Sequence, residues 1–220
     1  MAQDQKWVPE NRMKTLLKYR QLTQLNWDSD IIIWPEASIT AYLNDVDDYY
    51  IKPLEIEAKQ HQVDLIVSLP MQDSVTGALY NGVLALGESR GIYKKNHLLP
   101  FGEYLPLQPM SGIVLNLLNI RLGSFSPGGD QQPLLQAGGY FFGTSIYYED
   151  AFASEVMRNI ESAAFLVNVT NDAWFGDSIE PHQHMQIARM RALESGRYLL
   201  RATNTGITGI IAPNGKVAKQ

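Results

Sequence analysis

The sequence alternates apolar runs of strand length with segments of helical period, and this alternation restricts the possible folds more than any other feature. The run at 30–34 is stopped by Pro35 and predicts a buried strand, and 63–69 predicts another. Between them, 45–61 predicts a helix that Pro53 breaks or kinks. Further strands are expected at 78–86, 91–95, 139–147, 164–169, 198–202 and 207–212, and further helices at 150–162 and 181–195. Such alternation is typical of layered α/β folds.

Composition excludes several classes of function. The chain has 220 residues without an internal repeat, which predicts a single domain over 1–220. Its net charge of -5 argues against a general nucleic-acid partner. It contains no cysteine, which excludes disulfides, thiolate metal sites and thiol catalysis by the chain as written. No stretch approaches the roughly 20 apolar residues of a transmembrane helix, so the chain as given is expected to be soluble.

Polar residues lie where three of the predicted strands end. Glu36 follows the apolar run that stops at Pro35, Lys95 ends the strand 91–95, and the segment SIYYED closes the strand 139–147. Strand ends are the usual positions for chemistry in α/β folds. A carboxylate and an ammonium there form either a general base with an electrostatic stabiliser around one nucleophile, or an ordinary salt bridge.

Several longer motifs carry a resemblance to a known family. WPEAS, YKKNHLLPFGE and the segment ending IYYED occur in the order and spacing of the nitrilase superfamily. The finer resemblance is to the nitrilase-like domain of bacterial apolipoprotein N-acyltransferase. It is carried by WPEAS, KNHLLPFGEYLPL, TNDAWFGDS followed by HMQIARMRALESGR, and ATNTGITGIIAPNGK. The resemblance covers nearly the whole chain and implies a four-layer α-β-β-α sandwich.

The resemblance also implies roles for individual residues. The superfamily has a catalytic triad of Glu, Lys and Cys. In this sequence Glu36 matches the Glu, which acts as general base, Lys95 matches the Lys, and Tyr147 stands at the position of the Cys. Three further residues are implied to support the site: Glu103, Tyr148 and Glu149. The backbone N–H of Tyr148 is the implied oxyanion donor. Others are implied to line the substrate pocket or its entrance: Trp7, Asn171, Trp174 and Phe175.

The implied reaction is acyl transfer in two halves. A cysteine thiolate takes an acyl chain from a phospholipid, and the amino group of a lipid-modified cysteine at a lipoprotein's N-terminus attacks the resulting thioester. The family uses no metal or organic cofactor. The resemblance implies a place in the bacterial inner membrane with this domain facing the periplasm, held there by membrane helices that we do not expect within this sequence.

The chain departs from that pattern in two ways. The nucleophile position holds Tyr147, and a phenol with a pKa near 10 is scarcely ionised at neutral pH. We therefore expect an impaired acyltransferase. The second departure is length, because the superfamily's first and last strands are expected to be missing, so we expect a domain truncated at both ends.

Two alternatives remain open at this stage. One is a soluble amidohydrolase of the same superfamily, which would equally need a cysteine. The other is a non-catalytic remnant that binds lipid or a protein partner. His182 and His184 have a spacing that could suit a metal, but no further ligand cluster is evident, so we expect no metal site.

Overall fold

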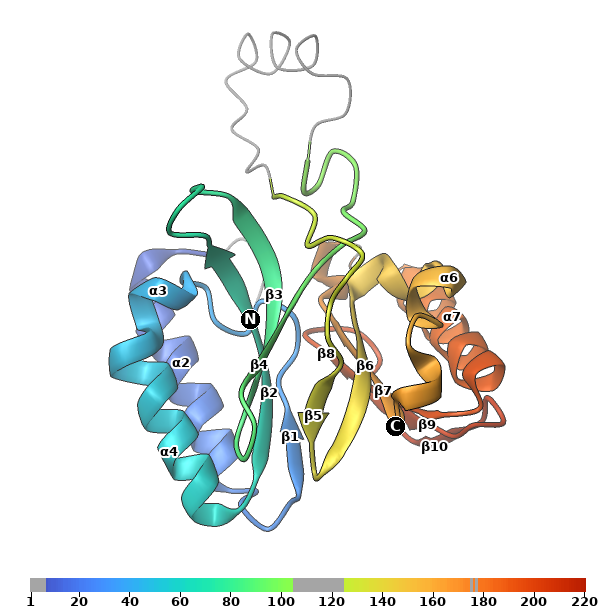
Figure 1. Ribbon diagram of the computed structural model, residues 1–220, viewed down its shortest axis with the longest axis horizontal. Helices are drawn as coiled ribbons and strands as arrows, with labels where there is room; N and C mark the ends of the chain where they lie inside the picture. The colour runs from blue at the N-terminus through green and yellow to red at the C-terminus, as the bar shows by residue number, and fades with distance from the viewer. Residues whose placement is uncertain (1–6, 105–124, 175, 177) are drawn as a thin grey trace, which may run out of the picture.

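Four layers make up the part of the chain that the computed structural model describes, residues 7–104, 125–174, 176 and 178–220 (Figure 1). Helices α2 (Pro9–Gln24) and α4 (Lys52–His61) cover the outer face of one sheet. A second sheet lies against its inner face, and α6 (Ala153–Val156) and α7 (Glu180–Ser195) cover the far side. The expected α-β-β-α sandwich is confirmed.

The first sheet has the strand order β1-β2-β3-β4. Only β1 and β2 run parallel, and the other neighbours are antiparallel. The central strand β2 is buried along nearly its whole length because helices cover one face and the second sheet covers the other. The strands are β1 (Ile31–Ile33), β2 (Asp64–Gln72), β3 (Leu79–Leu86) and β4 (Gly91–Lys94).

The second sheet has the order β10-β9-β8-β7-β6-β5. Its strands are β5 (Leu135–Ala137), β6 (Tyr140–Ile146), β7 (Phe165–Thr170), β8 (Tyr198–Thr203), β9 (Gly209–Ile211) and β10 (Val217–Lys219). Strands β6, β7 and β8 are mutually parallel, so their carboxyl ends lie at one edge. Tyr147 directly follows β6 there, and Asn171 directly follows β7.

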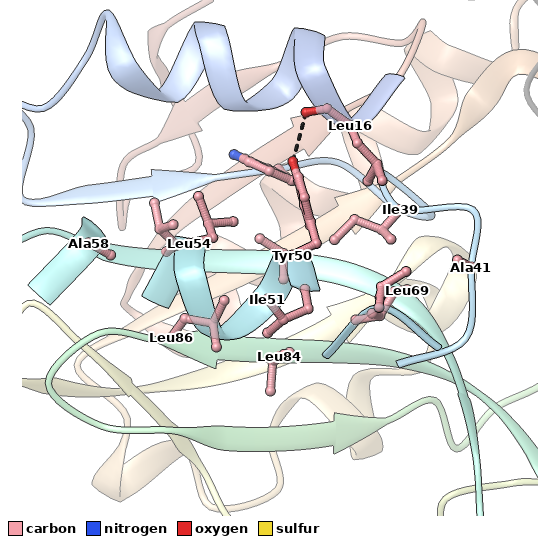
Figure 2. Packing of buried hydrophobic residues seen from close by; sticks show 14 of the residues in the cluster. Leu16, Ile39, Ala41, Tyr50, Ile51, Leu54, Ala58, Leu69, Leu84 and Leu86 are labelled. Carbon is pink, nitrogen blue, oxygen red and sulfur yellow. Dashed lines mark hydrogen bonds between the residues drawn. The ribbon is translucent and has the colours of Figure 1, made fainter. Parts of the chain in front are cut away.

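Each interface between layers has its own apolar core. Between the helices and the first sheet, Leu16 of α2 and Leu54 of α4 are almost fully buried, and the Tyr50 hydroxyl donates to the Leu16 carbonyl at 2.7 Å (Figure 2). Phe142 and Val167 are buried between the sheets. Met185 and Ala188 of α7 pack on the second sheet.

Two predicted helices differ in detail. The segment 45–61 is helical, as expected, but forms α3 (Leu43–Val46), a π-helical turn η1 (Asp47–Ile51) and then α4, whose second residue is Pro53. A wider turn directly before a proline accommodates its missing N–H. The predicted helix 150–162 is wrong. The chain forms short 3₁₀ turns η2 (Tyr147–Ala151) and η3 (Ile160–Ser162) around the four-residue α6.

Helix α2 had no counterpart in the predictions. Its apolar residues are spread around the helix, since Leu16 is buried while Met13, Leu17 and Leu22 are about half exposed. Such a distribution gives weak periodicity. Within the described residues, no helix has the length and apolar character needed to cross a bilayer.

Candidate active site

A cavity of about 410 Å³ opens where strands from both sheets end. Residues from well-separated parts of the sequence line it, including Trp7, Glu36, Asn81, Lys95, Glu103, Tyr147 and Asn171. The carboxylate, the amine and the phenol expected at one place therefore do face one cavity. Tyr148 and Glu149 lie beside it rather than in its lining.

A chain of polar contacts joins the two carboxylates to the lysine. The Lys95 ammonium is 1% exposed and lies 2.8 Å from Glu103 Oε2. The Asn81 amide donates to Glu36 Oε1 at 2.8 Å and to Glu103 Oε1 at 3.2 Å. A buried cation needs such a partner, because moving a charge out of water without a compensating interaction costs on the order of 5 kcal/mol. Asn81 was not among the site residues predicted from the sequence, although a polar amide within the apolar run of β3 could have indicated a functional position.

Tyr147 occupies a sharp turn at the end of β6. Its φ of 53° lies in the left-handed region, which costs a non-glycine residue about 1–2 kcal/mol. Its side chain is 8% exposed, and the ammonium of Lys95 lies 5.3 Å from the ring centroid. Burial, followed by the carboxylates of Glu180 and Asp172, raises the phenol pKa above its usual value. The phenol therefore stays neutral at physiological pH.

Glu149 links the ends of the two sheets. The carboxylate is 1% exposed and accepts a hydrogen bond from the Tyr93 hydroxyl at 3.1 Å. Three backbone N–H groups also donate to it: those of Asn96 and His97, which follow β4, at 2.7 and 3.0 Å, and that of Ile146, the last residue of β6, at 2.8 Å. Burial raises the pKa of Glu149 to about 7, against the opposing effects of Lys95 and these N–H donors.

The remaining predicted site residues lie at the rim or beyond the described part. Trp7 is half exposed at the mouth of the cavity, and Asn171 is buried and accepts a hydrogen bond from the Asn204 amide at 3.1 Å. Tyr148 is 42% exposed, with its ring edge-on to that of Phe152. Trp174 ends the 3₁₀ turn η4 (Asp172–Trp174), but its side chain and the whole of Phe175 lie outside the described residues.

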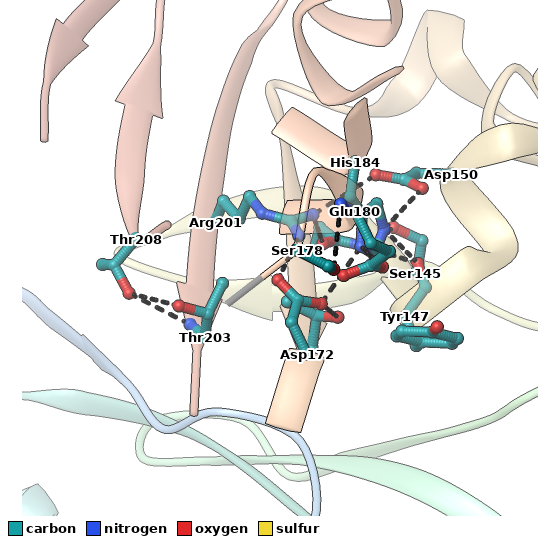
Figure 3. Close-up of polar contacts among 12 residues, drawn as sticks. Ser145, Tyr147, Asp150, Asp172, Ser178, Glu180, His184, Arg201, Thr203 and Thr208 are labelled. Carbon is teal, nitrogen blue, oxygen red and sulfur yellow. Dashed lines mark hydrogen bonds and ion pairs between the residues drawn. The ribbon is translucent and has the colours of Figure 1, made fainter. Parts of the chain in front are cut away.

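A buried charged network lies behind the turn at position 147 (Figure 3). The imidazole of His184 contacts Asp150 Oδ1 at 3.0 Å and Asp172 Oδ1 at 3.2 Å. The Arg201 guanidinium lies 3.2 Å from Asp172 Oδ2 and 3.5 Å from Asp150 Oδ2. The expectation that no ligand cluster accompanies His184 was wrong, because Asp172, Glu180 and His184 place ligand atoms within 4.8 Å of one another.

This network makes folding stability depend on pH. Burial disfavours the charged form of His184, but its hydrogen bonds to Asp150 and Asp172 outweigh burial and raise its pKa from 6.5 to about 9. The folded chain therefore holds more protons than the unfolded chain between these values. The contribution is complete below about 6.5 and is lost as pH rises through about 9.

We expect the free energy of unfolding to fall by about 2–3 kcal/mol between pH 7 and about 9.5. The raised pKa of Glu149 also lowers the free energy of unfolding as pH rises from about 4.5 to about 7, and most of that change is complete below this window. Urea titrations should show the slope in the parent chain and in His182→Gln, whose side chain is exposed on the same helix, but not in His184→Gln. An equal slope in all three proteins would contradict the assignment.

Comparisons with known proteins agree with this architecture. The sequence profile of the carbon–nitrogen hydrolase family matches residues 1–220. The chain is similar in fold to a carbon–nitrogen hydrolase superfamily protein from Xanthomonas campestris, with a TM-score of 0.71 at 15% identity over 94% of this chain and 79% of that one. A carbon–nitrogen hydrolase from Helicobacter pylori gives 0.71 at 16% identity with the same coverage.

Sequence similarity is higher to proteins of one named activity. The chain is 51% identical to the apolipoprotein N-acyltransferase of Methylococcus capsulatus over 98% of its own length and 43% of that protein. It is 41% identical to that of Coxiella burnetii, over 100% of this chain and 45% of the relative. The chain thus spans less than half the length of these relatives. Its full-length profile match and its layered architecture establish that this chain belongs to the carbon–nitrogen hydrolase family.

Proposed function

We propose that this chain is the acyl-transfer domain of an apolipoprotein N-acyltransferase, and that Tyr147 at the nucleophile position leaves this copy impaired. The observation that carries the proposal is the cavity in which Glu36, Lys95 and Tyr147 meet at the left-handed turn after β6. The similarity to relatives named for that activity supports it.

Each residue then has a chemical role when the nucleophile is a cysteine. Glu36 takes the thiol proton, and the thiolate attacks the ester carbonyl of a phospholipid. Lys95 and the backbone N–H of Tyr148 stabilise the oxyanion. The C–O bond breaks, the lysophospholipid alkoxide takes the proton from Glu36, and an acyl thioester remains. Glu103 holds the Lys95 ammonium in place by its contact at 2.8 Å.

In the second half of the reaction the same steps occur with an amine as the nucleophile. The lipoprotein's amino group attacks the thioester carbonyl and Glu36 accepts its proton. The C–S bond breaks as the amide bond forms, and the leaving thiolate takes the proton from Glu36, which regenerates the thiol. The residues that we assign to substrate contact are Trp7, Asn171, Trp174 and Phe175. The partners are a phospholipid and a lipoprotein N-terminus, and the place of action is the periplasmic face of a bacterial inner membrane.

Tyr147 fails in this role for two physical reasons. Its phenol is buried with a raised pKa, so the phenolate that would attack an ester is scarce. Its ring also occupies part of the space at the cavity into which an acyl carbonyl must fit.

Tyr147→Cys is expected to restore acyl-enzyme formation from none to one acyl group per chain. The chain is incubated with phospholipid–detergent micelles and its intact mass is measured, with hydroxylamine release as the check for a thioester. Ser145→Cys is the matched control, since it places a thiol two residues upstream in β6 and outside the cavity lining. No adduct on Tyr147→Cys would contradict the proposal, and hydrolysis of a small amide by this variant would favour the amidohydrolase alternative.

A further inference from the structure

Both ring nitrogens of His184 face only hydrogen-bond acceptors. Nε2 lies 3.2 Å from the carbonyl oxygen of Tyr147 and 3.0 Å from Asp150 Oδ1. Nδ1 lies 3.2 Å from Asp172 Oδ1 and 3.6 Å from Glu180 Oε1. A carbonyl cannot donate, and an ionised carboxylate cannot either, so each nitrogen must carry a hydrogen. The arrangement fits an imidazolium and neither neutral tautomer.

The backbone carbonyl of residue 147 is held by two buried side chains. Besides His184, the Asn168 amide donates to it at 3.2 Å and to Ser145 Oγ at 2.9 Å. Asn168 is in turn fixed by Arg201, whose guanidinium donates to its Oδ1 at 2.6 Å. A non-glycine residue persists in left-handed backbone only when its surroundings hold it there. These two donors supply that restraint.

We propose that His184 is a positioning residue, whose buried imidazolium fixes the carbonyl of residue 147 and thereby the turn that presents side chain 147 to the cavity. Asp150 and Asp172, on the two short turns that follow β6 and β7, hold the ring from opposite edges. The importance of that turn rests on the proposed function, in which position 147 carries the nucleophile.

The same residues do not form a good metal site. Arg201 already compensates Asp172 and Asp150, and its side chain is fully buried. A dication beside Asp172 and Glu180 would lie close to this guanidinium and would have to displace the hydrogens of His184. The groups that face the imidazole are Asp150, Asp172, Glu180, Arg201 and the Tyr147 ring, which meets it edge-on at 5.3 Å.

A unique thiol can report on this turn without any acyl transfer. The chain has no cysteine, so Tyr147→Cys carries one thiol, and its rate of alkylation by iodoacetamide against pH gives the pKa of that thiol. Next to Lys95 this pKa should lie below the usual value of about 8.5. If His184 holds the turn, adding His184→Gln moves the thiol of residue 147 away from Lys95 and raises the pKa of that thiol.

We expect alkylation near pH 6 to be about tenfold slower in Tyr147→Cys/His184→Gln than in Tyr147→Cys, the effect of about one pKa unit. Tyr147→Cys/His182→Gln should stay within about twofold, because His182 is exposed one half-turn away on α7. Matching pH profiles in all three proteins would overturn the proposal. Since no lipid is involved, this result is independent of whether Tyr147→Cys acquires acyl groups.

A second measurement covers the case in which His184→Gln fails to fold. Nitrogen NMR of the unsubstituted chain, assigned by replacing His61, His97 and His182 in turn, should show His184 with both ring nitrogens protonated at neutral pH. A neutral tautomer would overturn the proposal. So would loss of a hydrogen from either His184 ring nitrogen on adding Zn²⁺ to the unsubstituted chain, because that result would indicate metal ligation.

Discussion

Lys95→Met in the Tyr147→Cys chain is expected to slow acyl-enzyme formation by about 10³-fold or more. The Lys95 ammonium is the cation that lines the cavity beside position 147, and in the parent chain it lies 5.3 Å from the ring centroid of Tyr147. In the proposed reaction we expect it to act twice, by stabilising the thiolate and by stabilising the tetrahedral oxyanion. Loss of one oxyanion donor alone typically costs about 10²–10³-fold. The measurement is the rate of mass increase with phospholipid.

Lys94→Met is the matched control for that experiment. Its ammonium lies 4.1 Å from the ring centroid of Tyr80 and is absent from the cavity lining. We expect its rate to stay within about twofold of the Tyr147→Cys rate. Similar losses from both lysines would mean that general charge, rather than the position of Lys95, supports the reaction. Far-ultraviolet circular dichroism of each variant verifies that its fold is retained.

Arg201→Met is expected to destabilise the fold by about 3–5 kcal/mol, the usual cost of removing one member of a buried ion pair. The Arg201 side chain is fully buried and approaches Asp150 at 3.5 Å and Asp172 at 3.2 Å. Its loss leaves two buried carboxylates that His184 alone must compensate. Burial itself raises the pKa of Asp172, and it stays below its usual value because His184 and Arg201 stabilise the carboxylate.

Arg158→Met is the matched control, which shows how much stability is lost when an exposed arginine is removed. Arg158 contacts Asp130 at 3.1 Å, but both side chains are substantially exposed. An exposed pair contributes about 0–1 kcal/mol, so the urea midpoint of Arg158→Met should scarcely move. A loss of less than about 1 kcal/mol in Arg201→Met would show that the charges of Asp150 and Asp172 do not need compensation by Arg201.

Sequence patterns predicted the framework of the fold because burial on both faces leaves long apolar runs, as in β2. They also placed Glu36 and Lys95 at strand ends, where the cavity opens. The helix predicted over 150–162 was wrong for a physical reason. Phe152 is extended and Asn159 is left-handed, so the helical path is interrupted twice.

Contacts between distant residues could not be read from periodicity. Asn81 joins Glu36 to Glu103 through a side-chain amide, and Arg201 reaches Asp172 across neighbouring strands. Nothing local distinguishes this arginine, in a strand, from an exposed one. His184 belonged to a motif, but its pairing with Asp150 and Asp172 depends on the turns that follow β6 and β7.

Glu149 has a consequence for how such a chain can change over generations. Its carboxylate accepts hydrogen bonds from the last residue of β6 in one sheet and from the segment that follows β4 in the other, so part of the site also holds the layers together. Selection for a folded chain alone would therefore preserve Glu149 and its neighbours, whether or not the reaction is performed. A substitution confined to position 147 would then leave the rest of the site in place.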